Sequence, residues 1–112
     1  MNDTYTFKYD SFDNEKYLFK SNKRSNVYIG ISIMNNQVDQ VRYITEPDVD
    51  EECTLLSYDE NGMTMRIRPK RIELPVMNVQ LVGNIPQEVV NALQNVNRYS
   101  CEEKISDRLR FY

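Results

Sequence analysis

The chain has 112 residues, with 14 Lys or Arg, 17 Asp or Glu and no His, so its formal charge is −3. That length suits one compact domain around a single hydrophobic core. Because histidine is the usual acid-base group near neutral pH and the commonest zinc ligand, its absence excludes Ser-His, Cys-His and His-metal mechanisms within this chain.

Alternating apolar and polar residues predict strands along the first third of the chain. Residues 4–9 alternate with aromatic side chains on one side, and residues 16–20 repeat this pattern. Polar stretches at 10–15 and 21–26 predict the connections on either side of the second strand. The clearest strand covers 26–34, where β-branched residues occupy every second position.

An Asn35-Asn36 pair then predicts a tight turn, and residues 38–45 predict the returning strand. Residues 46–52 contain five carboxylates and a proline, which predict an acidic loop. Hard cations need clustered oxygen ligands, but the spacing of a calcium-binding loop is missing here. We therefore expect a solvated loop and no metal site, with an acidic patch for a basic partner as the functional alternative.

Three more strands are expected in the middle of the chain, over residues 53–58, 63–68 and 76–82. Between the first two stands Asn61-Gly62, a strong hairpin signal that favours a type I′ turn. Pro69 and Pro75 interrupt the pattern before the last strand.

After Gly83 the apolar period changes from 2 to 3.6, which predicts a helix over 85–97. Asn84 is its expected cap, with Gln87 in the capping-box position. The apolar stripe of this helix consists of Ile85, Val89, Leu93 and Val96. A second capping box and a short stripe predict another helix over 101–110.

These elements predict an α+β, strand-dominated fold within a single domain covering 1–112, strand-rich over 4–82 and helical over 85–110. Short connections favour antiparallel pairing, and six or seven strands of this length curl into a barrel or a sandwich. We expect one or two C-terminal helices to cap it, because the Val/Leu stripe needs a surface on which to be buried.

Basic residues gather in two strand segments, and aromatic side chains flank the first of them. Lysine and arginine bind phosphates and rings stack on bases, so this pattern suits single-stranded nucleic acid or an anionic nucleotide, although the net charge is negative. The candidate ligand-binding residues are Lys20, Lys23, Arg24, Arg66, Arg68, Lys70 and Arg71.

One of these segments resembles a known nucleotide-binding element. Lys20–Arg24 resembles the RxxxR element of PilZ domains, and Ser57–Gly62 resembles their DxSxxG element. PilZ domains are small β-barrels with a C-terminal helix, and many bind cyclic di-GMP. The resemblance implies phosphate and guanine contacts at Lys20 and Arg24. Lys20 stands in place of the first Arg, Ser57 in place of Asp and Asp59 in place of Ser, so Arg24 and Gly62 alone match.

Tyrosine is enriched in protein interfaces, because it buries area while keeping a polar tip. The chain has eight Tyr, and we take Tyr28, Tyr43 and Tyr58 as candidate partner-binding residues. The two cysteines, Cys53 and Cys101, are far apart and form no CxxC pair, so we expect reduced thiols, with a disulfide as the alternative.

We expect a small non-catalytic binding module, an adaptor, inhibitor or assembly protein that acts by protein-protein contact and uses no cofactor. Binding of nucleic acid or a cyclic dinucleotide is the alternative. A homodimer is compatible with the aromatic content. No apolar run reaches membrane-spanning length and no export signal is visible, so we expect a cytoplasmic protein without a membrane partner. Twelve Asn against a single Ala suggest a phage, viral or mobile-element origin.

Overall fold

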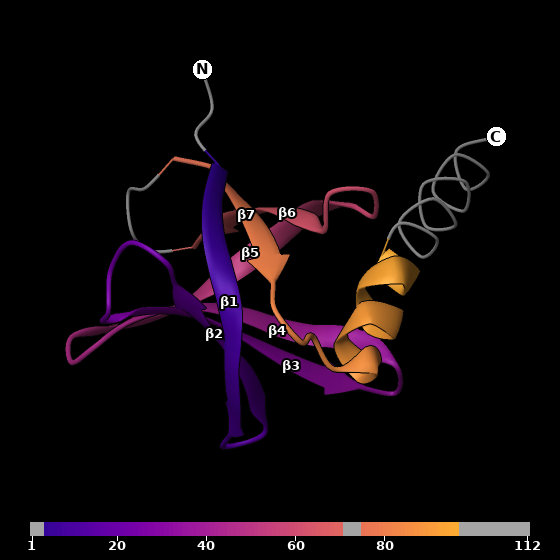
Figure 1. Ribbon diagram of the computed structural model, residues 1–112, viewed down its shortest axis with the longest axis horizontal. Coiled ribbons are helices and arrows are strands. Elements are labelled where there is room, and N and C mark those ends of the chain that lie inside the picture. Colours follow the sequence, from indigo (N-terminus) through magenta and orange to yellow (C-terminus); the bar gives the residue numbers. More distant parts are fainter. Residues whose placement is uncertain (1–3, 71–74, 97–112) are drawn as a thin grey trace, which may run out of the picture.

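The computed structural model describes residues 4–70 and 75–96, which form seven strands and one helix (Figure 1). The strands are β1 (Thr4–Asp13), β2 (Lys16–Ser21), β3 (Val27–Met34), β4 (Gln37–Thr45), β5 (Val49–Asp59), β6 (Thr64–Pro69) and β7 (Met77–Val82). The helix is described over residues 87–96.

The strands close into a barrel in chain order, with β1 beside β7. Neighbours in sequence pair antiparallel, whereas β1 pairs with β7 in parallel, from Thr4↔Asn78 to Lys8↔Val82. The reason is topological: in a chain that reverses direction at each turn, the first and seventh strands run the same way. The predicted strand-dominated fold is confirmed, and of the two expected architectures the structure shows the barrel and not the sandwich. The predicted purely antiparallel pairing is wrong.

The barrel interior contains the apolar side chains that alternate along each strand. Phe19, Ile29, Ile31, Met65 and Ile67 are fully buried. Each such side chain contributes roughly 1.5–3 kcal/mol when it is removed from water. The period-2 pattern therefore predicted the inward face of the strands correctly.

The first hairpin is longer than expected, because residues 10–13 continue β1 instead of forming a loop. A register shift between Tyr9 and Ser11 lets the strand keep pairing with β2. The turn itself is only Asn14 and Glu15, with φ of 53° and 64°. Two successive positive φ values give the twist that a two-residue hairpin needs.

The acidic segment is also less of a loop than expected. The turn covers residues 46–48, and β5 begins at Val49. Asp50 and Glu51 lie in the strand, opposite Ile44 and Tyr43 of β4. Pairing with β4 satisfies the backbone of these residues, and this outweighs the weak strand propensity of carboxylates.

The hairpin between β5 and β6 forms where Asn61-Gly62 predicts it, but the turn is not type I′. Residues 60–63 form the turn, and the positive φ, 50°, is at Met63. The backbone N–H of Asn61 donates to the Asp59 carboxylate at 3.0 Å. This side-chain contact supports a longer turn than the dipeptide alone indicates.

The helix begins at residue 87, two residues later than expected, and the Val90 N–H donates to the Pro86 carbonyl. The side chains of Val89 and Leu93 are fully buried and pack against the core of the barrel. The helix therefore caps the barrel end that carries the β1–β2, β3–β4 and β5–β6 turns. We call this end of the barrel the helix end, and we call the opposite end the loop end. The predicted second helix, 101–110, lies outside the described residues.

Across the described part of the chain, no helix is both long and apolar enough to cross a membrane.

Candidate functional site

The pairing between β4 and β5 stops partway along the two strands. It runs from Thr45↔Val49 to Val41↔Cys53. Toward the helix end, residues 37–40 of β4 pair with β3, while β5 continues by pairing with β6. The two strands diverge there beside the helix, as Figure 1 shows. We call this wedge between β4 and β5 the seam.

A cavity of about 200 Å³ occupies the seam. Its rim is polar and includes Asp39, Gln40 and Glu52. The amide of Asn95, also in its lining, donates to the Asn36 carbonyl at 2.8 Å and so ties the helix to the β3–β4 hairpin. The apolar lining comes from Val38, Val41, Cys53, Leu55, Ala92 and Val96. The lining therefore combines apolar and polar side chains, as a concave binding site does.

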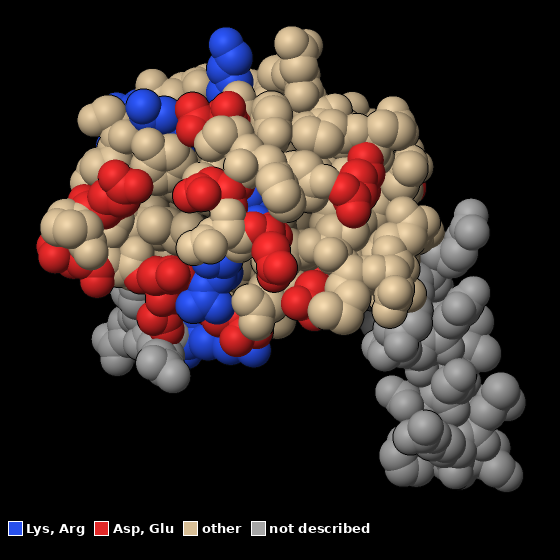
Figure 2. All heavy atoms as spheres, turned by 90° about the horizontal axis from the view of Figure 1, so that it is seen from below, with Lys and Arg blue, Asp and Glu red and all other residues tan. Residues whose placement is uncertain are grey.

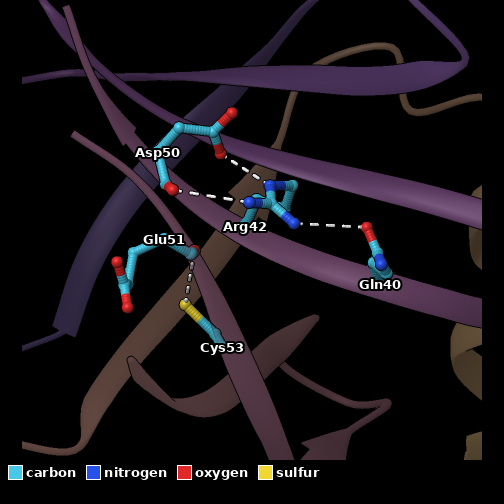
Figure 3. Close-up of polar contacts among 5 residues, drawn as sticks. All are labelled: Gln40, Arg42, Asp50, Glu51 and Cys53. Atoms are coloured by element: carbon cyan, nitrogen blue, oxygen red, sulfur yellow. Dashed lines mark hydrogen bonds and ion pairs between the residues drawn. The ribbon is translucent and has the colours of Figure 1, made fainter. Parts of the chain in front are cut away.

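Arg42 bridges β4 and β5 just where their pairing ends (Figure 3). Its Nε donates to Asp50 Oδ1 at 2.6 Å, and one terminal nitrogen donates to Gln40 Oε1 at 3.3 Å. The other terminal nitrogen donates to the Asp50 carbonyl at 3.4 Å. This charge-assisted fork holds the two strands together at the closed end of the seam and orients Gln40 on its rim.

Cys53 forms part of the apolar lining and is a free thiol, 5% exposed. Its Sγ donates weakly to the Glu51 carbonyl at 3.7 Å. Burial raises the pKa of the thiol from its ordinary value of 9.0 to about 11. Since the thiolate is the reactive form, this side chain behaves as an apolar surface and not as a nucleophile.

Cys53 is expected to resist alkylation while the barrel is folded. At pH 8 we expect iodoacetamide to modify it at least tenfold more slowly than in urea, because burial disfavours the thiolate. The folded barrel favours the neutral thiol, so its contribution to stability is complete below pH 9 and is lost as the pH rises toward 11. Peptide mass spectrometry measures the rate, with Lys8→Cys as the exposed control. Equal rates at the two positions would contradict the burial.

The two basic segments do not meet on the barrel. Lys20 is on β2, and Lys23 and Arg24 follow it in the β2–β3 connection. Arg66 and Arg68 are on β6, which β1 and β7 separate from β2. In the view of Figure 2, red predominates and blue gathers at separate places, so no continuous basic surface crosses this face.

Two of the candidate ligand-binding lysines already have partners within the chain. Lys70 Nζ lies 3.0 Å from a Glu52 oxygen, and Lys20 Nζ lies 5.9 Å from the centre of the Tyr28 ring. Lys23, Arg24, Arg66 and Arg68 are exposed, and Arg71 lies outside the described residues.

The three candidate tyrosines have different environments. Tyr58 is 4% exposed, with its hydroxyl 3.2 Å from the Met63 sulfur, so the expectation that it lies at the surface is wrong. Its alternation in β5 places it inside, opposite Met65. Tyr43 is half-buried against the core. Tyr28 alone faces outward, in a hollow of about 150 Å³.

The two PilZ-like elements lie at opposite ends of the barrel. Residues 20–24 end β2 and lead into a connection at the loop end, whereas the turn at residues 60–63 is at the helix end. No protein-family model matches the chain, and comparisons with curated proteins and solved structures also find no match. The PilZ resemblance therefore rests on the local residue pattern alone. Among the described residues, no group of three or more Cys, Asp or Glu is arranged to hold a metal ion.

Sequence reasoning missed the seam. Residues 38–41 and 53–55 were correctly expected to be in strands, but strand propensity carries no information about where two strands stop pairing. Arg42 was also missed, because a single arginine on a strand is an ordinary solvated residue. The sequence offered no signal for the seam, because the extra length of β5, 11 residues against nine in β4, appears only in the structure.

Proposed function

We propose that this protein is a non-catalytic binding module that holds a segment of another protein in the seam between β4 and β5. The observation that supports this proposal is the cavity, with an apolar part and a polar rim, at the point where the β4–β5 pairing ends. A cavity of about 200 Å³ has room for one large side chain, since an apolar cavity of about 150 Å³ already accepts benzene.

The polar rim supports a protein partner over a nucleic acid. Asp39 lies beside the cavity and carries a negative charge that repels phosphates, whereas the charge of Glu52 is paired with Lys70. The exposed arginines, Arg66 and Arg68, are on β6, which is not one of the two strands that form the seam. Charged rims of this kind mainly set association rate and specificity, while the apolar lining supplies affinity.

A photo-crosslinking residue at Gln40, on the rim, tests the proposal in the native host. We expect it to capture one protein, with the crosslink mapping to a single short segment. The purified partner should then bind the isolated chain, and Val38→Glu should weaken that binding at least tenfold by placing a charge in the apolar lining. The folded state of the variant is checked by thermal unfolding.

Lys8, exposed on β1, is the matched control position, and a crosslinker there should not capture the same segment. Equal capture from both positions, or unchanged binding by a folded Val38→Glu variant, would contradict the proposed site. Salt-sensitive crosslinking of oligonucleotide at Arg66 would instead support the nucleic-acid alternative.

A further inference from the structure

We infer that the partner segment binds as an extended strand, which adds to the β5 side of the seam and places one apolar side chain in the cavity. This inference rests on the proposed function and specifies the class of partner: an extended peptide with an apolar anchor and a lysine or arginine next to it.

The backbone of β5 supports strand addition. Beyond Cys53, β5 pairs with β6 on one side, up to Asp59↔Thr64, while its pairing with β4 has ended. A strand edge of this kind presents N–H and C=O groups that another chain can pair with. The Asn95–Asn36 hydrogen bond ties the helix to the β3–β4 hairpin, on the β4 side of the seam.

Leu56 marks the same stretch of β5. Its side chain is 40% exposed, one of four large apolar side chains exposed to this extent among the described residues. The register shift between Leu55 and Ser57 leaves Leu56 without a partner opposite it on β6. A bulge at this position turns the side chain outward, and an added strand would cover it.

The cavity and its rim define the side chains of the peptide. Val41, Cys53 and Leu55 offer an apolar surface for one inward-pointing side chain. In an extended peptide the neighbouring side chains point the other way, toward the rim, where Asp39 and Glu52 favour a cation. Glu52 already pairs with Lys70, so Asp39 is the main acidic contact.

The shape of the site favours a strand over a helix. An amphipathic helix needs a long groove for anchors at i, i+3, i+4 and i+7. The seam is instead a wedge between two strand edges, with a cavity for about one side chain. Its closed end, at the Arg42 bridge, limits how far any segment can extend between the strands.

The probe for the test is a library of fluorescein-labelled heptapeptides in which Lys or Thr alternates with Val, Leu, Ile or Phe. Fluorescence anisotropy with the full chain identifies the tightest peptide. That peptide is then N-methylated at one backbone amide at a time. We expect alternate amides to matter: methylation of those facing β5 should weaken binding about tenfold, and methylation of the others should have little effect, because one lost hydrogen bond at a desolvated edge has that magnitude.

The matched protein variants are Leu56→Ala and Leu56→Pro. Both remove the exposed side chain, but only proline also removes the backbone N–H, at a position that has no partner on β6. Leu56→Pro should bind the peptide several-fold more weakly than Leu56→Ala. If the proline variant does not fold, the N-methyl series on the unchanged protein decides the question.

Uniform effects of N-methylation, or a helical bound peptide, would overturn strand addition, while the Gln40 crosslink would still support a binding module. Failure of every peptide in the library, together with a mapped Gln40 crosslink to a folded domain surface, would also overturn it. Failure of the crosslink itself contradicts the proposed function, whatever the peptides do.

Discussion

Replacing Phe19 with alanine is expected to lower the free energy of unfolding by about 3–5 kcal/mol. Phe19 is fully buried in β2, opposite Ile29 of β3, and its ring makes an edge-to-face contact with the Tyr9 ring, with the two centroids 5.5 Å apart. The loss combines the transfer of the ring to water with the cavity left behind. Urea unfolding followed by circular dichroism measures it.

Phe12→Ala is the matched control, because Phe12 lies at the tip of the β1–β2 hairpin and is 56% exposed. Truncation there should change the free energy of unfolding far less, since the ring stays largely in water in both states. Similar losses for the two phenylalanines would show that the β1–β2 hairpin is not placed as described.

Leu93→Ala is expected to lower the free energy of unfolding by about 2–5 kcal/mol. Leu93 is fully buried and belongs to the same core cluster as the barrel interior, so its loss leaves a cavity between the helix and the barrel. The helix also carries Ala92 and Val96, which line the seam. The variant should therefore also bind the peptide probe more weakly than the unchanged chain.

The neighbouring Gln94 is exposed on the same helix, which makes Gln94→Ala the control for helix propensity. It should change stability by no more than about 0.5 kcal/mol. A Leu93→Ala variant as stable as the control would mean that the helix does not close the barrel.

The strands were predictable because each has one buried face. In β3, Val27, Ile29 and Ile31 are buried at every second position, as the period-2 pattern requires. The errors fall where a longer-range contact outweighs local preference. Residues 10–13 read as a turn but pair with β2, and residues 50–52 read as a loop but pair with β4.

The candidate site was far less predictable than the strands. The aromatic and basic candidates were selected by residue type, and in the structure they lie in different environments. Tyr58 is buried in the core, Lys20 lies over the Tyr28 ring, and Lys70 pairs with Glu52. Residue type indicates what a side chain can do, whereas its neighbours depend on which strands are adjacent and on their register.

A strand-dominated chain with a helix after Gly83, and the absence of any histidine chemistry from this chain, can be derived from the residues alone. Apolar periodicity and composition depend only on which residues are present and in what order, so they can be read without knowing which segments pair. Tertiary structure alone decided that the barrel closes through a parallel β1–β7 pair and that β4 and β5 part beyond Val41↔Cys53. Both features depend on pairing between distant segments. The seam exists because, toward the helix end, β5 stays paired with β6 while β4 stays paired with β3.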